Sequence, residues 1–139
     1  TEGGYAKEAS EDFKKKQEDL LSETLKKIDI VICTALIPGK KAPVIIKEGM
    51  INNMGAGSII YDLAAIQGGN TSHTKVDEIV DCNGVKIMGE SNILNKLPTS
   101  ASNLYAKNVF NFVSNLYDKE NNKINISLED EIIEKTLIK

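Results

Sequence analysis

The sequence predicts an α/β fold in which a mostly parallel sheet carries functional loops at the carboxyl ends of its strands. Two β-branched runs, 28–35 and 58–63, each stop abruptly at a loop of small residues and glycine, and a segment of helical period separates them. Strands that alternate with helices through short loops are typical of parallel sheets, which bind ligands at their strand ends. We therefore expect function to reside in the loops 34–40 and 64–70.

Length and composition favour one globular domain. The chain has 139 residues, 41% of them hydrophobic and 27% charged, which is enough to bury a core. A net charge of -3 disfavours nucleic acid or an anionic membrane surface as a partner. No apolar run approaches the roughly 20 residues of a membrane helix. Two cysteines are too few for a disulfide framework, so we expect Cys33 to be a buried thiol in a reducing compartment.

The first two elements are a loop and a helix. Residues 1–10 contain glycine and polar residues without an apolar period, which predicts a mobile loop. Apolar side chains then recur at helical spacing from Glu11 to about Lys27, and Ser10 or Asp12 can cap this helix.

Two strands with a short helix between them come next. The continuous run 28–35 predicts a strand buried on both faces by helices. A short helix is expected over 47–54, and a second buried strand over 58–63.

A hairpin follows. Asn83-Gly84 lies between the apolar segments 79–82 and 85–88 and is typical of a two-residue turn in which both residues adopt positive φ. The second arm of this hairpin is also expected to be a third core strand.

The last third of the chain begins with an amphipathic helix. Ser100 or Ser102 can cap it, and its apolar face up to Leu116 is too wide to be left in water, so we expect it to pack on the sheet. Residues 124–128 alternate like an edge strand, and residues 129–139 form a short charged tail.

These elements correspond to only half of a dinucleotide-binding fold. A complete Rossmann fold has two βαβαβ halves and a Gly-x-Gly-x-x-Gly motif in its first turn. Gly55-Ala56-Gly57 lies between a helix and a strand, which is the wrong context for that motif. The sequence therefore predicts a Rossmann-like but incomplete α/β fold, the second half.

Several motifs resemble those of the proton-translocating NAD(P) transhydrogenase α subunit. They are Gly3-Gly4-Tyr5-Ala6-Lys7, Thr34-Ala35-Leu36-Ile37-Pro38-Gly39-Lys40 with Ala42-Pro43, Asp62-Leu63-Ala64 and Gly68-Gly69-Asn70. The resemblance covers nearly the whole chain. It implies that residues 11–128 are the carboxyl-terminal part of the NAD(H)-binding domain, with 1–10 as its mobile loop and 129–139 as a tail. Alanine dehydrogenases are more distantly similar.

The resemblance implies NAD(H) as the cofactor of this component. By family match the cofactor-binding residues are Gly4 in the closing loop, Gln17 on the first helix and Leu36 at the end of the first strand. Tyr5, the flat aromatic of the closing loop, and Ala35, beside Leu36, are expected to bind the cofactor with them. Asp62 ends a buried strand, where an unpaired carboxylate is costly. A nicotinamide contact and an Asx turn into Gly68-Gly69 are equally compatible with Asp62. Asn92 is a weaker candidate at the end of the third strand.

The resemblance implies hydride transfer between NAD(H) and NADP(H), coupled to proton translocation. This transfer requires no nucleophile or proton-transferring side chain, because the two cofactors carry the reactive carbon and hydrogen. We therefore assign no catalytic residue. His73 is the only histidine and lies beside Thr71, Ser72 and Thr74 without a cluster at metal-ligand spacing, so we expect a surface position and no metal.

The resemblance also implies partners. It predicts an amino-terminal part of the α subunit, an NADP(H)-binding β subunit and a membrane domain, with this chain peripheral on the cytoplasmic side of a bacterial inner membrane or on the mitochondrial matrix side. A homodimer is expected, and this chain alone is expected to be inactive.

Two alternatives stay open. One is a fragment of an alanine dehydrogenase-like enzyme. The other is a non-catalytic remnant that serves as an assembly module, which departures from the family pattern favour. These departures are at Ala9, Gly55, Ile66, Leu94 and Lys96.

Overall fold

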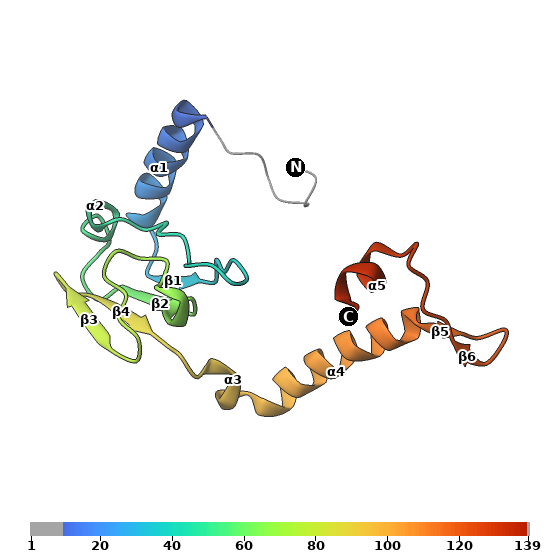
Figure 1. Ribbon diagram of the computed structural model, residues 1–139. Helices are drawn as coiled ribbons and strands as arrows, with labels where there is room; N and C mark the ends of the chain where they lie inside the picture. The colour runs from blue at the N-terminus through green and yellow to red at the C-terminus, as the bar shows by residue number, and fades with distance from the viewer. Residues whose placement is uncertain (1–9, 139) are drawn as a thin grey trace. The chain divides into compact units, whose positions relative to one another are not determined.

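The computed structural model describes residues 10–138 and divides the chain into two compact units, Thr1–Ile93 and Leu94–Lys139, each described by itself (Figure 1). In the first unit the elements are α1 (Glu11–Leu25), β1 (Ile30–Cys33), α2 (Glu48–Ile51), β2 (Ile59–Asp62), a 3-10 turn at Ala65–Gln67, β3 (Ile79–Cys82) and β4 (Val85–Gly89).

The four strands form one sheet in the order β1-β2-β4-β3. β1, β2 and β4 are parallel, and β3 is antiparallel to β4. The predicted α/β class with a mostly parallel sheet is therefore confirmed. In register, Cys33 pairs with Asp62 and Asp62 with Gly89, so the three parallel strands end together at one edge of the sheet.

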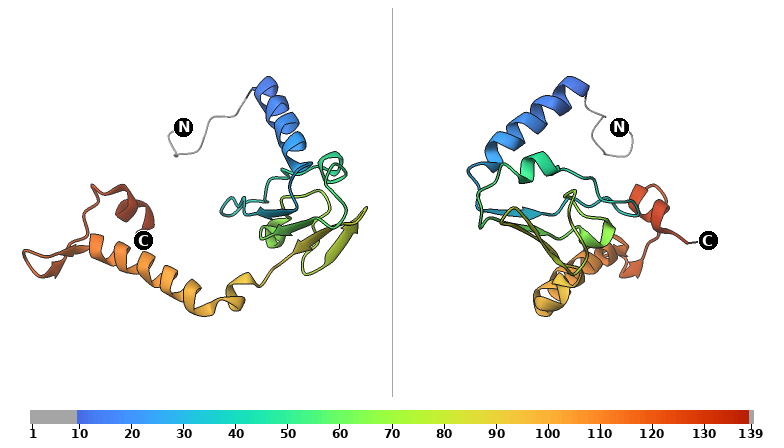
Figure 2. Two further views of the ribbon diagram at one scale, coloured as in Figure 1. Left: turned by 180° about the vertical axis from the view of Figure 1, so that it is seen from behind. Right: turned by 90° about the vertical axis from the view of Figure 1, so that its left-hand side faces the viewer.

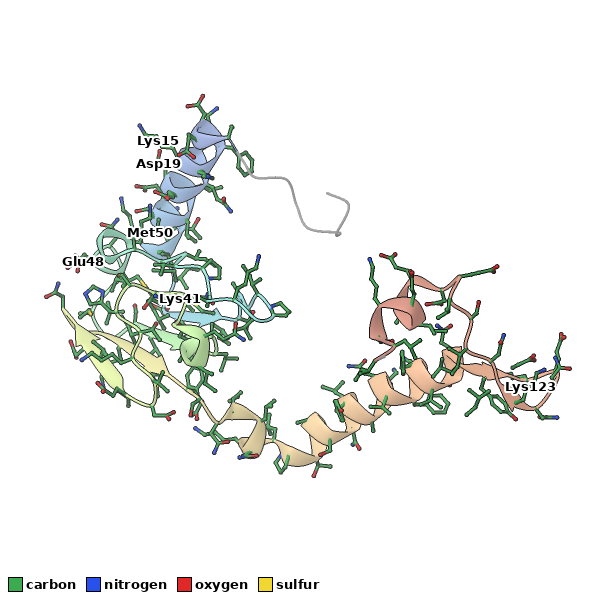
Figure 3. All side chains as sticks on the ribbon, in the orientation of Figure 1. Lys15, Asp19, Lys41, Glu48, Met50 and Lys123 are labelled. Carbon is green, nitrogen blue, oxygen red and sulfur yellow. The ribbon has the colours of Figure 1, made fainter. Side chains whose placement is uncertain are left out.

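The core lies on one face of this sheet. Val31, Ile60 and Ile87 occupy the same register row on three strands, and the last two are fully buried. Helices α1 and α2 cover this face, as the right-hand view of Figure 2 shows. Leu25 at the end of α1 and Met50 of α2 belong to the same cluster, and Met50 is labelled in Figure 3.

The opposite face is open. Ile30 and Ile32 are 65% and 66% exposed, and Ile79 is 64% exposed. Within the first unit α1 and α2 both pack on the core face, so only one face of the strand expected over 28–35 is covered there. Burial of its second face stays a prediction.

Local sequence signals explain several boundaries. The Ser10 hydroxyl accepts a hydrogen bond from the Phe13 backbone at 3.3 Å, which confirms the predicted cap of α1. This helix ends at Leu25, two residues earlier than expected. In the hairpin, Asn83 and Gly84 have φ of 54° and 85°, which confirms the predicted turn. The buried side chains of Val85 and Ile87 confirm β4 as a core strand.

The second unit contains short elements around one long helix. After α3 (Ile93–Lys96) come α4 (Pro98–Asn115), β5 (Tyr117–Asp118), β6 (Lys123–Ile124) and α5 (Glu131–Thr136). The predicted serine cap of the long helix is wrong, because the helix begins at Pro98, whose fixed φ and missing N–H suit a first helical position.

One further expectation for this region needs correction, and the structure adds a helix to another. The edge strand expected over 124–128 is limited to Lys123–Ile124, which pairs with β5. The charged tail contains α5, whose Asp130 cap accepts hydrogen bonds from the backbones of Ile132 and Ile133.

The apolar face of α4 is exposed within the second unit: Leu104, Phe110 and Val113 are 67%, 68% and 52% exposed. Packing of this helix on the sheet concerns the relation between the two units and stays a prediction. Across residues 10–138, no helix combines the length and apolar character needed to cross a membrane.

Candidate functional site

The carboxyl ends of β1 and β2 are joined by a buried polar network. Asp62 is fully buried, and its Oδ1 accepts a hydrogen bond from the Ala64 backbone at 2.9 Å. Its Oδ2 accepts from the Asn70 backbone at 2.6 Å and from the Thr74 hydroxyl. Protein donors thus compensate the burial of this carboxylate, which would otherwise be costly. The Asp62–Ala64 bond is the Asx turn considered from the sequence.

Asn70 extends this network to the loop after β1. Its Oδ1 accepts a hydrogen bond from the Ala35 N–H, and its Nδ2 donates to the Ala35 carbonyl, both at 2.9 Å. The same Nδ2 donates to the Pro43 carbonyl at 2.9 Å. One buried amide therefore holds two segments that lie about thirty residues earlier in the chain.

Gln67 holds the next part of the same loop. With its amide oriented by the surrounding acceptors, its nitrogen donates to the carbonyls of Lys40 at 2.9 Å and Ile37 at 3.1 Å. The Ala42 N–H also donates to the Gln67 carbonyl at 2.7 Å. Side chains from the loop after β2 thus fix the loop after β1 at two positions.

Two adjoining pockets lie between α1, the end of β1 and the segment 44–46. One, of about 280 Å³, is lined by Thr34, Ala35 and Asn70 together with apolar side chains. The other, of about 240 Å³, contains Gln17, Lys14 and Glu18. Both pockets include Leu21 and Ile45, which makes them neighbours.

The structure brings two of the predicted cofactor residues into these pockets. Ala35 lines the larger one and Gln17 the smaller one. Leu36 follows Ala35 on the same loop and is 48% exposed. Asp62 contacts this loop only indirectly, since it accepts a hydrogen bond from the Asn70 backbone and the Asn70 side chain bonds to Ala35. Gly4 and Tyr5 lie outside the described residues, so their roles stay predictions.

The remaining candidates lie elsewhere. Asn92 is exposed after β4, whose end shares the sheet edge with β1 and β2. His73 is partly exposed, and its Nδ1 lies 2.9 Å from the Ser72 hydroxyl.

Electrostatics distinguish the interior of the site from its rim. Burial, reinforced by the negative charge of Asp62, raises the pKa of the Cys33 thiol to about 11, so this thiol stays protonated. At the rim, the Glu18 carboxylate lies 2.5 Å from the Lys47 ammonium, and both side chains are exposed. The larger pocket, lined by Ala35 and Asn70, is therefore an inner pocket of neutral groups. The smaller one, lined by Gln17, Lys14 and Glu18, is an outer pocket of an amide and charged groups.

Two hollows lie in the second unit. One, of about 550 Å³, is lined by residues of α3 and α4 such as Asn95, Ser102 and Tyr105, and it contains none of the predicted cofactor residues. The other lies at the carboxyl end of α4. It measures about 550 Å³ and is lined mainly by Phe110, Val113, Leu116, Tyr117 and Ile124 of α4 and the β5–β6 hairpin. Its walls are almost wholly apolar and offer few polar groups to orient a ligand, whereas ligand sites combine both kinds of group. We therefore place the candidate site in the first unit.

Asn70 and Thr74 are the residues of the candidate site that sequence reasoning did not single out. Asn70 belongs to the Gly68-Gly69-Asn70 motif, but the motif alone assigns it no role. Its signal was a polar residue directly after two glycines in the loop that follows a buried strand. Gly69 has φ of 83°, and a Cβ there would lie 2.5 Å from the Thr74 side chain.

With this geometry established, comparisons with known proteins identify the family. The family described as "Alanine dehydrogenase/PNT, C-terminal domain" matches residues 5–139. The chain belongs to this family. Within it, the chain is 46% identical over 138 residues to the first part of the NAD(P) transhydrogenase alpha subunit of Rhodospirillum rubrum, a match that covers 99% of this chain and 36% of that protein.

Two further relatives are a transhydrogenase and an alanine dehydrogenase, the two kinds of protein that the family description names. The crystal structure of transhydrogenase from Sinorhizobium meliloti superposes with a TM-score of 0.70 at 36% identity, over 91% of this chain and 36% of that one. Alanine dehydrogenase 1 of Staphylococcus aureus is 31% identical over 103 residues, which is 71% of this chain and 28% of that enzyme. The family resemblance inferred from the motifs is confirmed, and the chain spans between a quarter and little more than a third of the length of its transhydrogenase relatives.

Proposed function

We propose that this chain supplies one wall of the NAD(H) site of a proton-translocating NAD(P) transhydrogenase. The observation that carries the proposal is the pair of adjoining pockets at the end of β1. They contain Gln17, a position that the family resemblance assigns to the nucleotide, and Ala35, which directly precedes another such position, Leu36. Parallel sheets bind dinucleotides at this position, outside the carboxyl ends of their strands.

The residues at the site suit such a cofactor. Ala35 leaves room beside its backbone, the apolar side chains of Leu21 and Ile45 suit a flat ring, and the Gln17 amide can bond a polar nucleotide group. Each pocket alone is smaller than the roughly 300 Å³ at which ligand sites begin. Two small neighbouring pockets beside the free edge of β1 are compatible with one wall of a larger site.

When bound, NAD(H) supplies the nicotinamide carbon and the hydride that passes to NADP(H). The residues of this chain bind and orient one nucleotide, and the fixed loop after β1 keeps it in place. In this proposal the amino-terminal part of the α subunit completes the NAD(H) site, a β subunit holds NADP(H), and a membrane domain couples the reaction to proton translocation. The complex is a homodimer of such units, and this chain is peripheral, on the cytoplasmic or the matrix side of the membrane.

The test uses the complete natural protein assembled with its partner subunits. Hydride transfer from NADH to an NADP⁺ analogue, one whose reduced form absorbs at a separate wavelength, supports the proposal. Alanine-dependent reduction of NAD⁺ identifies the alanine dehydrogenase alternative, which the Staphylococcus aureus relative favours. Neither activity, in a protein that still assembles, identifies the non-catalytic alternative.

Titration of NADH into the 139-residue chain tests the incomplete site separately. Weak or absent heat is expected, because the chain offers only one wall. Tight binding by the chain alone would contradict this aspect of the proposal.

A further inference from the structure

The loop after β1 is held mainly by side chains of a distant loop. The backbone ladder between β1 and β2 ends with the Leu63 N–H donating to the Cys33 carbonyl at 2.9 Å. Two residues further on, both backbone groups of Ala35 bond to the side chain of Asn70. The conformation of the pocket wall at Ala35 therefore depends on one amide.

Asn70 is itself fixed from several directions. The Asn70 side chain is fully buried, and the Asn70 backbone N–H donates to the Asp62 carboxylate. Its carbonyl accepts from the N–H groups of Ile45 and Ile46 at 2.8 and 2.9 Å. Ala35, Ile45 and Ile46 all line the larger pocket, as Asn70 itself does, so Asn70 connects two segments of its wall.

We propose that Asn70 is a positioning residue that sets the affinity for the nucleotide by holding the loop after β1 in its binding conformation. This inference rests on the proposed NAD(H) site. Only an amide of this length offers both the acceptor that the Ala35 N–H needs and the donors that the carbonyls of Ala35 and Pro43 need. An ionised carboxylate keeps the acceptor and loses the donors, and an alanine loses both.

A loop that samples other conformations binds less well in proportion to its binding-competent fraction. Loss of the two hydrogen bonds to Ala35 is expected to lower that fraction about tenfold. Saturating nucleotide shifts the loop to its binding conformation, because the ligand stabilises that conformation. Asn70 variants should therefore raise KM for NADH and leave kcat nearly unchanged, whereas a purely structural defect lowers the active fraction at constant KM.

The experiment compares Asn70→Asp and Asn70→Ala in the complete protein with its partners. Asn53→Asp is the matched control, because Asn53 is exposed in the turn after α2 and undergoes the same chemical change. If the buried charge of Asn70→Asp prevents folding, Asn70→Ala carries the test without a charge. Hydrogen exchange at the Ala35 amide is measured without nucleotide, with Ile87 in the sheet core as the internal reference.

In Asn70→Ala we expect faster exchange at Ala35 with unchanged exchange at Ile87, and a KM for NADH raised about tenfold with kcat within about twofold of wild type. Unchanged KM together with unchanged Ala35 exchange, in a wild type that binds NADH, overturns the positioning role alone. A wild-type protein that does not bind NADH overturns the proposed function, and the affinity role of Asn70 falls with it.

Discussion

The Thr74 hydroxyl donates a hydrogen bond to the Oδ2 atom of Asp62, a carboxylate with no exposed surface. The Oδ1 atom accepts from the Ala64 backbone, and Oδ2 also accepts from the Asn70 backbone. Charge burial at the end of β2 is thus compensated by three donors from the loop that follows. This arrangement links the stability of the first unit to the order of the loop after β2.

Thr74→Val should destabilise the protein by about 1–3 kcal/mol, because it removes one donor from a buried carboxylate and keeps the side-chain volume. Thr74→Ser keeps the hydroxyl and should recover most of this loss. Urea denaturation of the two variants measures the difference. Equal midpoints for Thr74→Val and wild type would show that the hydroxyl contributes nothing to the stability of this network.

Gly89 ends β4 at a point where the backbone of Lys75 passes close by. A Cβ at position 89 would lie 2.1 Å from the Lys75 carbonyl oxygen. Gly89→Ala should therefore cost roughly 3 kcal/mol, because backbone must shift to relieve the overlap. The control is Gly49→Ala in α2, where the new Cβ meets open space. It should be neutral or stabilise by up to about 1 kcal/mol in thermal denaturation. Equal effects of the two substitutions would contradict the close contact at Gly89.

The sequence was sufficient to predict the strands of the first unit and the mostly parallel character of their sheet. Continuous β-branched runs distinguish the core strands β1 and β2 from helices, and Asn83-Gly84 fixes the hairpin because few other pairs tolerate two positive φ values. The coverage of the second face of the sheet could not be predicted. Periodicity shows that a strand is apolar, but it does not show which helices pack on which face.

The location of the candidate site at the strand ends could be predicted from the sequence, but the hydrogen bonds that hold its loop could not. The residues 34 and 35 continue an apolar run and were expected to extend the first strand. In the structure the strand ends at Cys33, since the backbone of Ala35 bonds to the Asn70 side chain. A contact between a backbone and a side chain 35 residues apart leaves no periodic signal in the sequence.

Cys33 should make the protein less stable at alkaline pH. Burial and the charge of Asp62 raise the pKa of its thiol from 9.0 to about 11 in the folded state. Below pH 9 the thiol is protonated in both states. Between about pH 9 and 11 only the unfolded chain loses the proton, so the free energy of unfolding falls by about 1.4 kcal/mol per pH unit from this group.

Denaturation curves across this range test the effect. Cys33→Ala should reduce the slope of stability against pH. Cys82→Ala changes a cysteine that is only half-buried and should leave most of the slope in place. A Cys33→Ala protein that keeps the full slope would assign the alkaline loss to other groups.

Gln17 gives the most direct test of the outer pocket. Its amide lines the hollow beside Lys14 and Glu18, although the side chain as a whole is exposed. Gln17→Ala in the complete protein should raise the dissociation constant of NADH about three- to tenfold, the effect of losing one hydrogen bond to a ligand. The control is Asp19→Ala on the same helix, labelled in Figure 3, which is exposed and outside the pocket. Fluorescence titration of NADH measures both variants. If the two substitutions change the affinity equally, the effect belongs to α1 as a whole, and the outer pocket does not contact the nucleotide.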